Sequence, residues 1–270
     1  MNPSFAIQTP GIEMGAASLL VKIGNSGLSY VIADDSGRFT HLFTYSGAAA
    51  SPDQLKAVID SDELLQAEFR RISIVWDFEQ ALSVPEAYNN AALNTEMVEL
   101  IYGNAISGRI RSDYVPAQRL HEVYKVPAAF SQALPENWQY LHQTHAYSLL
   151  LESIPATGAH LQVIFSANQL TAVLSKDGRL QIVQQFGYNS ANDAAYYLLN
   201  ICESFSVNPE EVQLHLGGTI DARSELYDTL HKYFLQLEFD SLPEGTVCSE
   251  AFSDLPAHYF AHLIAFSQCV

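Results

Sequence analysis

Short apolar runs separated by polar turns open the chain and predict three strands in succession. The runs occupy residues 19–23, 28–33 and 38–45. The turns between them contain Gly27 and Gly37, and apolar runs bounded by such turns are typical of antiparallel hairpins. Ser51 predicts a helix start, because a serine followed by proline and, three positions on, by glutamine matches the preferred N-terminal pattern. A fourth strand is expected at residues 71–76.

The same order of elements returns in the second half of the chain. Strands are predicted at residues 161–165, 170–174, 179–186 and 212–216. Ser190 and Asp193 form the capping pair of a helix between the third and the fourth of these strands. Leu161 follows Leu19 by 142 residues, and Ser190 follows Ser51 by 139. This nearly constant offset predicts a duplicated unit of three strands, a helix and a strand. The alternative is two unrelated segments with similar turns.

Further helices and strands alternate after each of these units. In the first half we expect a helix at 94–102, two strands within 109–126 that break at Pro116, a strand at 138–142 and a helix at 144–153. In the second half we expect a helix at 222–234, a strand at 236–239 and a closing helix at 256–266. The helix at 94–102 has Met97, Leu100 and Ile101 as its apolar positions. Residues 154–158 are expected to link two domains, 1–153 and 154–270. The whole predicts an α/β fold of mixed sheets with helices on both faces.

The composition is that of a folded protein, and its charge argues against nucleic acids and anionic membranes as partners. Hydrophobic residues make up 48% of the 270 residues, which rules out wholesale disorder. The 30 acidic residues outnumber the 13 lysines and arginines, so the formal net charge is −17. A surface with this charge repels nucleic-acid phosphates and anionic lipid headgroups. Neither nucleic-acid binding nor membrane insertion is therefore expected.

The cysteines and the N-terminus predict a cytoplasmic protein. The first residues lack the basic segment and the apolar stretch of a secretory signal. Cys202, Cys248 and Cys269 are odd in number and widely spaced, so reduced thiols are expected rather than disulfides. His258 and His262 share a helix face, but zinc needs further ligands, and none stands at a suitable spacing. No metal site is predicted.

The duplicated order resembles the actin-like ATPase fold, which is built from two ribonuclease H-like domains. That superfamily includes actin, sugar kinases, the large heat-shock chaperones, and bacterial cell-division and pilus-assembly proteins. In length and order the chain is most similar to an uncharacterised bacterial family with this fold. The resemblance covers about residues 15–265 and rests on the order and spacing of elements.

The resemblance implies that two hairpins, one from each domain, hold the phosphates of a nucleotide. The first hairpin of these ATPases carries an Asp-x-Gly pattern whose aspartate helps to place Mg²⁺. Here Lys22 stands at the aspartate position, followed by Gly24, Asn25 and Ser26. Mg²⁺ takes oxygen ligands, which a lysine does not offer. Lys22 is expected to reach solvent, and Asp77 is expected to be a solvated acid at a strand end.

The second hairpin departs further from the family pattern. Ile164 and Ser166 occupy its aspartate and glycine positions, and a backbone without glycine approaches phosphate less closely. By the resemblance, the paired glycines after the strand at 212–216 match those near adenine. The candidate nucleotide-binding residues are therefore Lys22, Gly24, Asn25, Ser26, Gly217, Gly218 and Thr219. The alternative is that these residues form ordinary turns without a ligand.

No catalytic residue can be named from the sequence. Walker A, GxGxxG and GxSxG patterns are absent, and the acids that a ribonuclease H-like nuclease needs are missing from the first strand of both halves. We therefore expect a non-catalytic scaffold that binds a protein partner, with the cleft between its domains as the candidate surface, more than an enzyme. The alternatives are a protein that binds ATP or hydrolyses it weakly in that cleft, and an enzyme acting on an unfamiliar small molecule.

Overall fold

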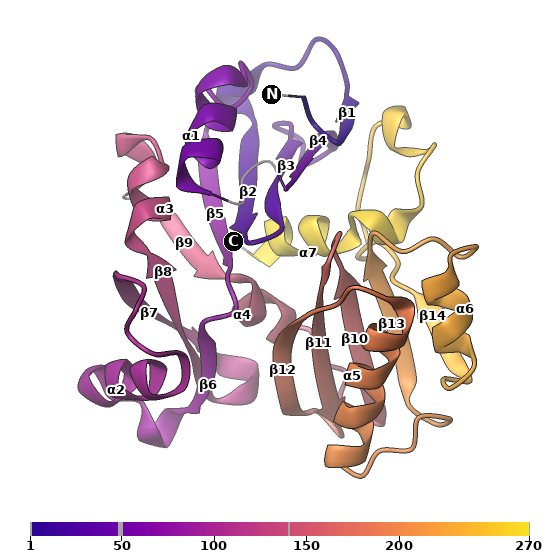
Figure 1. Ribbon diagram of the computed structural model, residues 1–270. Coiled ribbons are helices and arrows are strands. Elements are labelled where there is room, and N and C mark those ends of the chain that lie inside the picture. The colour runs from indigo at the N-terminus through magenta and orange to yellow at the C-terminus, as the bar shows by residue number, and fades with distance from the viewer. Residues whose placement is uncertain (1, 48–50, 140, 270) are drawn as a thin grey trace. The chain divides into compact units, whose positions relative to one another are not determined.

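The computed structural model describes residues 2–47, 51–139 and 141–269 (Figure 1). Its contacts divide the chain into two compact units. The first unit is Met1–Leu149 with Gly245–Asp254 and Phe266–Val270, and the second is Leu150–Glu244 with Leu255–Ala265. The domain ranges 1–153 and 154–270 stay predictions. The segment Gly245–Asp254 joins the first unit through backbone hydrogen bonds from Phe39 N–H to Val247 O and from Ser249 N–H to Phe39 O, both 2.9 Å.

A six-stranded mixed sheet forms the centre of the first unit. In spatial order its strands are β1 (Phe5–Gln8), β4 (Phe39–Ser46), β3 (Gly27–Ala33), β2 (Ser18–Gly24), β5 (Arg71–Asp77) and β9 (His142–His145). The pairs from β1 to β2 are antiparallel, and β2, β5 and β9 run parallel. The central strand β2 is buried on both faces, which explains its continuous apolar run.

The predicted helix at Ser51 is α1 (Pro52–Ser61). The Ser51 hydroxyl accepts a hydrogen bond from Gln54 N–H at 3.3 Å, and Leu55, Val58 and Ile59 are buried. The strand predicted at 138–142 is wrong in position. Pro135 precedes a short 3₁₀ turn, η4 (Glu136–Trp138), which buries the Trp138 side chain, and the strand begins only at β9.

A smaller sheet in the first unit carries a helix on one face. Its strands, in order, are β6 (Ala81–Pro85), β8 (Leu120–Pro127) and β7 (Gly108–Val115), and the helix is α2 (Ala91–Tyr102). The break predicted at Pro116 is confirmed by the 3₁₀ turn η3 (Pro116–Gln118). Val98 of α2 packs against Val84 and Val123. Leu100 and Ile101, predicted as apolar positions of the helix, are instead exposed, because Asn94 and Val98 occupy the face toward the sheet.

A five-stranded sheet with the same order forms the second unit. Its strands are β12 (Arg179–Gly187), β11 (Gln169–Lys176), β10 (Ala159–Phe165), β13 (Gln213–Gly218) and β14 (Gln236–Phe239). The first three are antiparallel, and β10, β13 and β14 run parallel. This order matches β4-β3-β2-β5-β9 of the first sheet, and the predicted mixed α/β fold is confirmed. A common origin of the two units stays a prediction.

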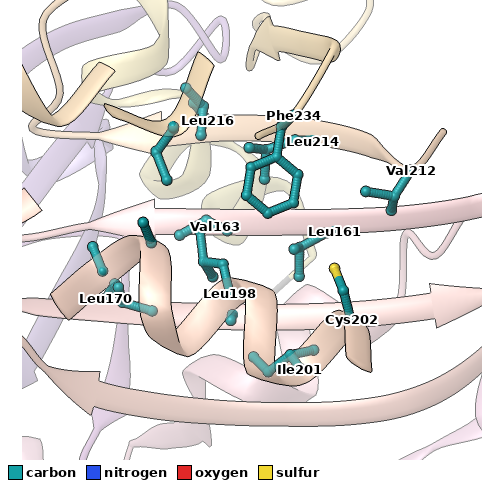
Figure 2. Close-up of a cluster of buried hydrophobic side chains, with 14 of the residues drawn as sticks. Leu161, Val163, Leu170, Leu198, Ile201, Cys202, Val212, Leu214, Leu216 and Phe234 are labelled. Atoms are coloured by element: carbon teal, nitrogen blue, oxygen red, sulfur yellow. The ribbon is translucent and has the colours of Figure 1, made fainter. Parts of the chain in front are cut away.

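Two helices cover one face of this second sheet. They are α5 (Ala191–Ser204) and α6 (Glu225–His231). The capping box predicted at Ser190 and Asp193 is present. Figure 2 shows Leu198 and Ile201 of α5 facing Leu161 and its neighbours on the sheet. Because this cluster is apolar, the polar residues of β10 and β13 lie on the opposite face.

The other helical segments are short. They are η1 (Met14–Ala16), η2 (Glu86–Tyr88), α3 (Ala128–Ala133), α4 (Ala146–Leu151), η5 (Glu250–Phe252), η6 (Ala257–Tyr259) and α7 (Ala261–Cys269). The helices of residues 2–47, 51–139 and 141–269 all fall short of the length and apolar character that a bilayer span needs.

Candidate functional site

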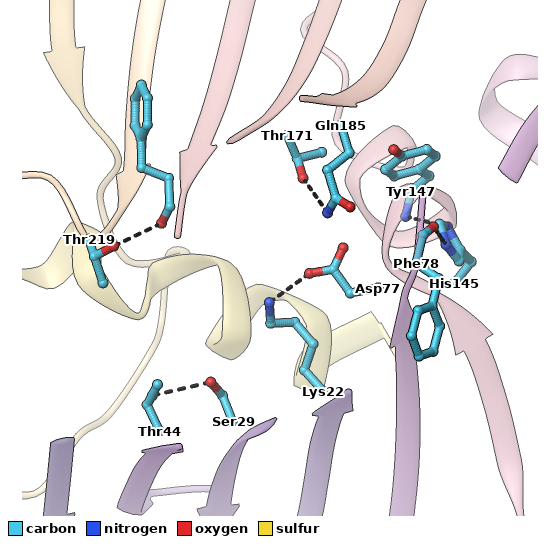
Figure 3. Close-up of polar contacts among 11 residues, drawn as sticks. Lys22, Ser29, Thr44, Asp77, Phe78, His145, Tyr147, Thr171, Gln185 and Thr219 are labelled. Carbon is cyan, nitrogen blue, oxygen red and sulfur yellow. Dashed lines mark hydrogen bonds and ion pairs between the residues drawn. The ribbon is translucent and has the colours of Figure 1, made fainter. Parts of the chain in front are cut away.

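Lys22 and Asp77 form a buried ion pair near the carboxyl ends of β2 and β5. The Lys22 Nζ atom lies 2.7 Å from Asp77 Oδ2, and the two side chains are 10% and 9% exposed (Figure 3). The parallel register places Gly24 beside Asp77, so the lysine side chain reaches forward along its own strand. The sequence predicted a solvent-reaching lysine and a solvated acid. Both predictions are wrong, because the two charges neutralise each other inside the unit.

This pair determines what the strand end can bind. Mg²⁺ needs several oxygen ligands, and here the ammonium group lies against the neighbouring carboxylate. A divalent cation would have to displace the lysine from Asp77 and leave a buried ammonium without its partner, which is costly. The residues at this end of the first sheet therefore do not fit Mg²⁺.

Gly24 has a packing role that needs no ligand. A Cβ atom at this position would lie 2.2 Å from the backbone oxygen of Asp77, so any other residue would push β2 and β5 apart. Asn25 and Ser26 form the turn after it, where Ser26 O accepts a hydrogen bond from Gly47 N–H at 3.0 Å. The predicted hairpin is confirmed, and its assignment to a phosphate stays a prediction.

His145 closes the neighbouring end of β9 as a neutral imidazole. Its Nδ1 accepts a hydrogen bond from Tyr147 N–H at 3.2 Å, so Nε2 carries the proton and donates to Phe78 O at 2.9 Å (Figure 3). Burial lowers the pKa of His145, which favours this neutral form. Both ring nitrogens are occupied, and the described part of the chain holds no group of three or more His, Cys, Asp or Glu residues suited to a metal ion.

The corresponding hairpin of the second unit satisfies its own backbone. Ser166 N–H donates to Gln169 O at 2.8 Å, and Tyr188 N–H donates to Asn168 O at 3.0 Å. The Tyr188 hydroxyl donates to Ser166 O at 3.0 Å. Ile164, which stands at the family's aspartate position, is buried. These groups offer neither a carboxylate nor an open row of N–H donors to a phosphate.

The paired glycines also have local structural reasons. Gly218 has a φ of +78°, and a Cβ there would lie 2.0 Å from Phe165 O. Thr219 N–H donates to the same oxygen at 2.8 Å. A Cβ on Gly217 would lie 2.5 Å from the Asp240 carboxylate. The glycines thus let β10, β13 and Asp240 approach one another, and the adenine site suggested by the resemblance stays a prediction.

The seven candidate nucleotide-binding residues fall into two groups, one in each unit. Lys22, Gly24, Asn25 and Ser26 share one turn region of the first unit, and Gly217, Gly218 and Thr219 share the end of β13 in the second.

A pocket in the second unit, with titratable residues in its wall, was missed from the sequence. It has a volume of about 170 Å³, and its walls include His160, Gln162, His215 and Asp240. His160 Nδ1 lies 2.9 Å from His215 Nε2, and burial lowers the pKa of His215. Burial raises the pKa of Asp240. The sequence does show polar residues alternating along β10 and β13, on the face opposite α5 and α6. It does not show that these two strands are neighbours in the sheet.

Solved structures with the same fold are similar to this chain at low sequence identity. A Bacteroides thetaiotaomicron protein with actin-like ATPase fold and unknown function shares 16% identity, with a TM-score of 0.77, over 94% of this chain and 96% of that one. The PilM-PilN type IV pilus biogenesis complex contains a chain with 15% identity and a TM-score of 0.60, over 93% of this chain and 98% of that one. These similarities establish the actin-like ATPase fold, and no curated protein sequence matches the chain.

Family membership agrees with the fold and extends over most of the sequence. The family described as "Protein of unknown function (DUF3822)" matches residues 12–237, and the chain belongs to this family.

Proposed function

We propose that this protein is a non-catalytic, actin-like scaffold that binds a protein partner. The single observation that carries the proposal is the buried ion pair between Lys22 and Asp77. It replaces the metal-placing carboxylate of the actin-like ATPase pattern with a charge-neutral contact. A fold that keeps its backbone while losing this chemistry is better suited to binding than to phosphoryl transfer.

The second unit supports the same proposal. Its hairpin has Ile164 where a carboxylate would be needed, and its polar backbone groups are hydrogen-bonded within the hairpin. Catalysis of phosphoryl transfer depends on metal and positioned donors, and neither hairpin supplies them. The PilM-PilN structure, a complex of two proteins, provides a precedent for partner binding on this fold.

The test is thermal unfolding and hydrolysis with ATP and Mg²⁺. A ligand at 100 times its Kd would add about 2.7 kcal/mol of stability, enough to raise the Tm by several degrees. We expect no such rise and no turnover in the wild type. We also expect none in Lys22→Asp, because the second hairpin remains altered. Lys56→Asp, at an exposed lysine, is the matched control. Turnover on the order of 1 s⁻¹, typical of competent phosphoryl-transfer enzymes, would overturn the proposal.

A further inference from the structure

Exposed apolar side chains concentrate in one stretch of the first unit. Among the described residues, ten large apolar or aromatic side chains are well exposed, and six of them lie between residues 88 and 114. The six are Tyr88, Leu93, Leu100, Ile101, Ile106 and Tyr114. Single exposed apolar residues are normal, whereas a gathering on neighbouring elements is typical of an interaction surface.

Helix α2 presents an apolar flank on the side of strand β7. Leu93, Met97, Leu100 and Ile101 follow the spacing of one helix side, and Leu100 is 85% exposed. Tyr102, on the opposite flank, donates its hydroxyl hydrogen bond to Ala81 O of β6. Since β6 and β7 are the two outer strands of the small sheet, the apolar flank is turned toward β7.

Strand β7 is an open edge. Among the described strands it pairs only with β8, over eight residues, at the edge of the small sheet (Figure 1). This pairing leaves the alternate N–H and C=O groups of its other side without a strand partner. Ser112 lies opposite Val123, whose side chain packs on α2, so Ile110 and Ser112 share the face toward the helix. Arg109 and Arg111 alternate onto the opposite face.

The edge is positively charged in an acidic protein. Strand β7 itself carries Arg109, Arg111 and Asp113, a net charge of +1, whereas the whole chain has a net charge of −17. Neither Arg109 nor Arg111 forms an ion pair with a described residue, and Arg111 Nε is buried without a hydrogen-bond partner. Asp113 is already occupied, because its Oδ2 accepts hydrogen bonds from Thr144, His145 and Ser148.

We propose that β7 binds an extended segment of a partner protein as an added strand. The segment alternates apolar residues, which contact the α2 flank, with acidic residues, which pair with Arg109 and Arg111. A second copy of this chain fits less well, since its own β7 would bring two more arginines and no free carboxylate to the edge. The inference rests on the proposed partner-binding function and names the surface and the chemistry of the partner.

The experiment selects peptides from a phage-displayed random dodecapeptide library with the full chain as bait. Enriched peptides are synthesised with a fluorophore, and their Kd is measured by anisotropy. We expect sequences in which acidic and apolar residues alternate, and binding that weakens as salt is added. We expect the double variant Arg109→Glu/Arg111→Glu to raise the Kd on the order of tenfold or more.

Matched variants separate this edge from the rest of the surface. Lys176→Glu/Arg179→Glu makes the same charge change at the exposed turn between β11 and β12, and it should leave the Kd unchanged. Leu100→Glu should weaken binding, whereas Leu235→Glu, at another exposed leucine, should not. Because Leu100 is almost fully exposed, its variant keeps the test valid if the double variant fails to fold.

Peptide backbone methylation tests strand addition itself. A strand pairs through the N–H groups of alternate residues, so N-methylation of one alternate set should abolish binding and methylation of the other set should preserve it. Equal peptide affinity for Arg109→Glu/Arg111→Glu and Lys176→Glu/Arg179→Glu would overturn the assignment of binding to β7. It would not affect the proposal that the protein is a scaffold. Failure to enrich any acidic-apolar peptide would overturn the inference, and saturable ATP binding would overturn the proposed function separately.

Discussion

The two sheets share a strand order, but the carboxylates at their strand ends have different surroundings. In the first unit, Asp77 at the end of β5 is neutralised by Lys22 at 2.7 Å. In the second, Asp240 directly follows β14, accepts a hydrogen bond from Gln162 at 3.4 Å, and has a pKa raised by burial. The pairing of strands fixes the fold, whereas the strand ends vary in charge without disturbing it. The two units therefore differ in the electrostatic surroundings of their strand-end acids. This difference predicts that their stability responds differently to mutation and to pH.

The largest effect is expected from removing the acid of the paired site. Asp77→Ala leaves the Lys22 ammonium buried without its partner, which should cost about 3–5 kcal/mol of unfolding free energy. Asp60→Ala, which breaks the exposed Lys56–Asp60 pair, should cost about 0.5 kcal/mol or less. Urea denaturation of both variants provides the measurement. Equal losses would show that the Lys22–Asp77 contact is no stronger than a surface pair.

A buried acid of the small sheet extends the comparison to pH. Glu122 of β8 is fully buried beside Ser83, and burial raises its pKa to about 7. Its folded pKa exceeds its unfolded value, so its protonated form contributes stability that is complete below about pH 4.5 and is lost as pH rises through 7. The wild type should lose up to about 3 kcal/mol over this window.

Glu122→Gln removes this titrating group while keeping a similar shape. Its unfolding free energy should fall less between pH 5 and pH 7.5 than that of the wild type, as measured by denaturation at each pH. Parallel curves for the two proteins would mean that Glu122 does not keep its proton in the folded state.

The close approach of β10 and β13 at Gly218 should make the second unit sensitive to an added methyl group. Gly218→Ala introduces a Cβ against Phe165 O in a left-handed conformation, and it should cost about 2 kcal/mol. Gly37→Ala has a similar φ of +83° but nothing within 4 Å, so its cost should stay near 1 kcal/mol. Differential thermal unfolding of the two variants measures the contribution of strand packing alone. A smaller loss of stability in Gly218→Ala than in Gly37→Ala would show that the strand contact at Gly218 does not add to the cost.

The smallest effect is expected at Asp240, which forms no ion pair with a described residue. Asp240→Asn removes a charge that burial disfavours, so stability at neutral pH should change by about 1 kcal/mol or less, in either direction. This variant should also show less pH dependence than the wild type. A loss comparable to that of Asp77→Ala would imply that Asp240 has a cationic partner and would remove the contrast between the two sheets.

Local signals were sufficient for most of the fold. The hairpin turns and the helix starts at Ser51 and Ser190 depend on neighbouring residues, and the structure confirms them. Strand β1 was missed because it is four residues long, with Ile7 as its one fully buried side chain, and it forms by pairing with the distant β4. Strand β6 was missed for a similar reason, since its register depends on β8.

The site was less predictable because it depends on contacts between distant residues. Lys22 was identified at the aspartate position, but its partner lies 55 residues away on a neighbouring parallel strand. Leu100 and Ile101 were named as apolar positions of the helix α2, yet a helical repeat alone does not say which flank faces the sheet, and both are exposed. The exposed flank, and with it the proposed surface at β7, emerged only from the packing of Val98 and Tyr102.

Isothermal titration calorimetry of the full chain with ATP and Mg²⁺ tests the central claim most directly. If the Lys22–Asp77 pair closes the strand end of the first unit, no saturable binding should appear below a Kd of about 1 mM. Saturable binding with a Kd in the micromolar range would contradict the account. It would show that the chain retains a working nucleotide site despite the charge-neutral pair.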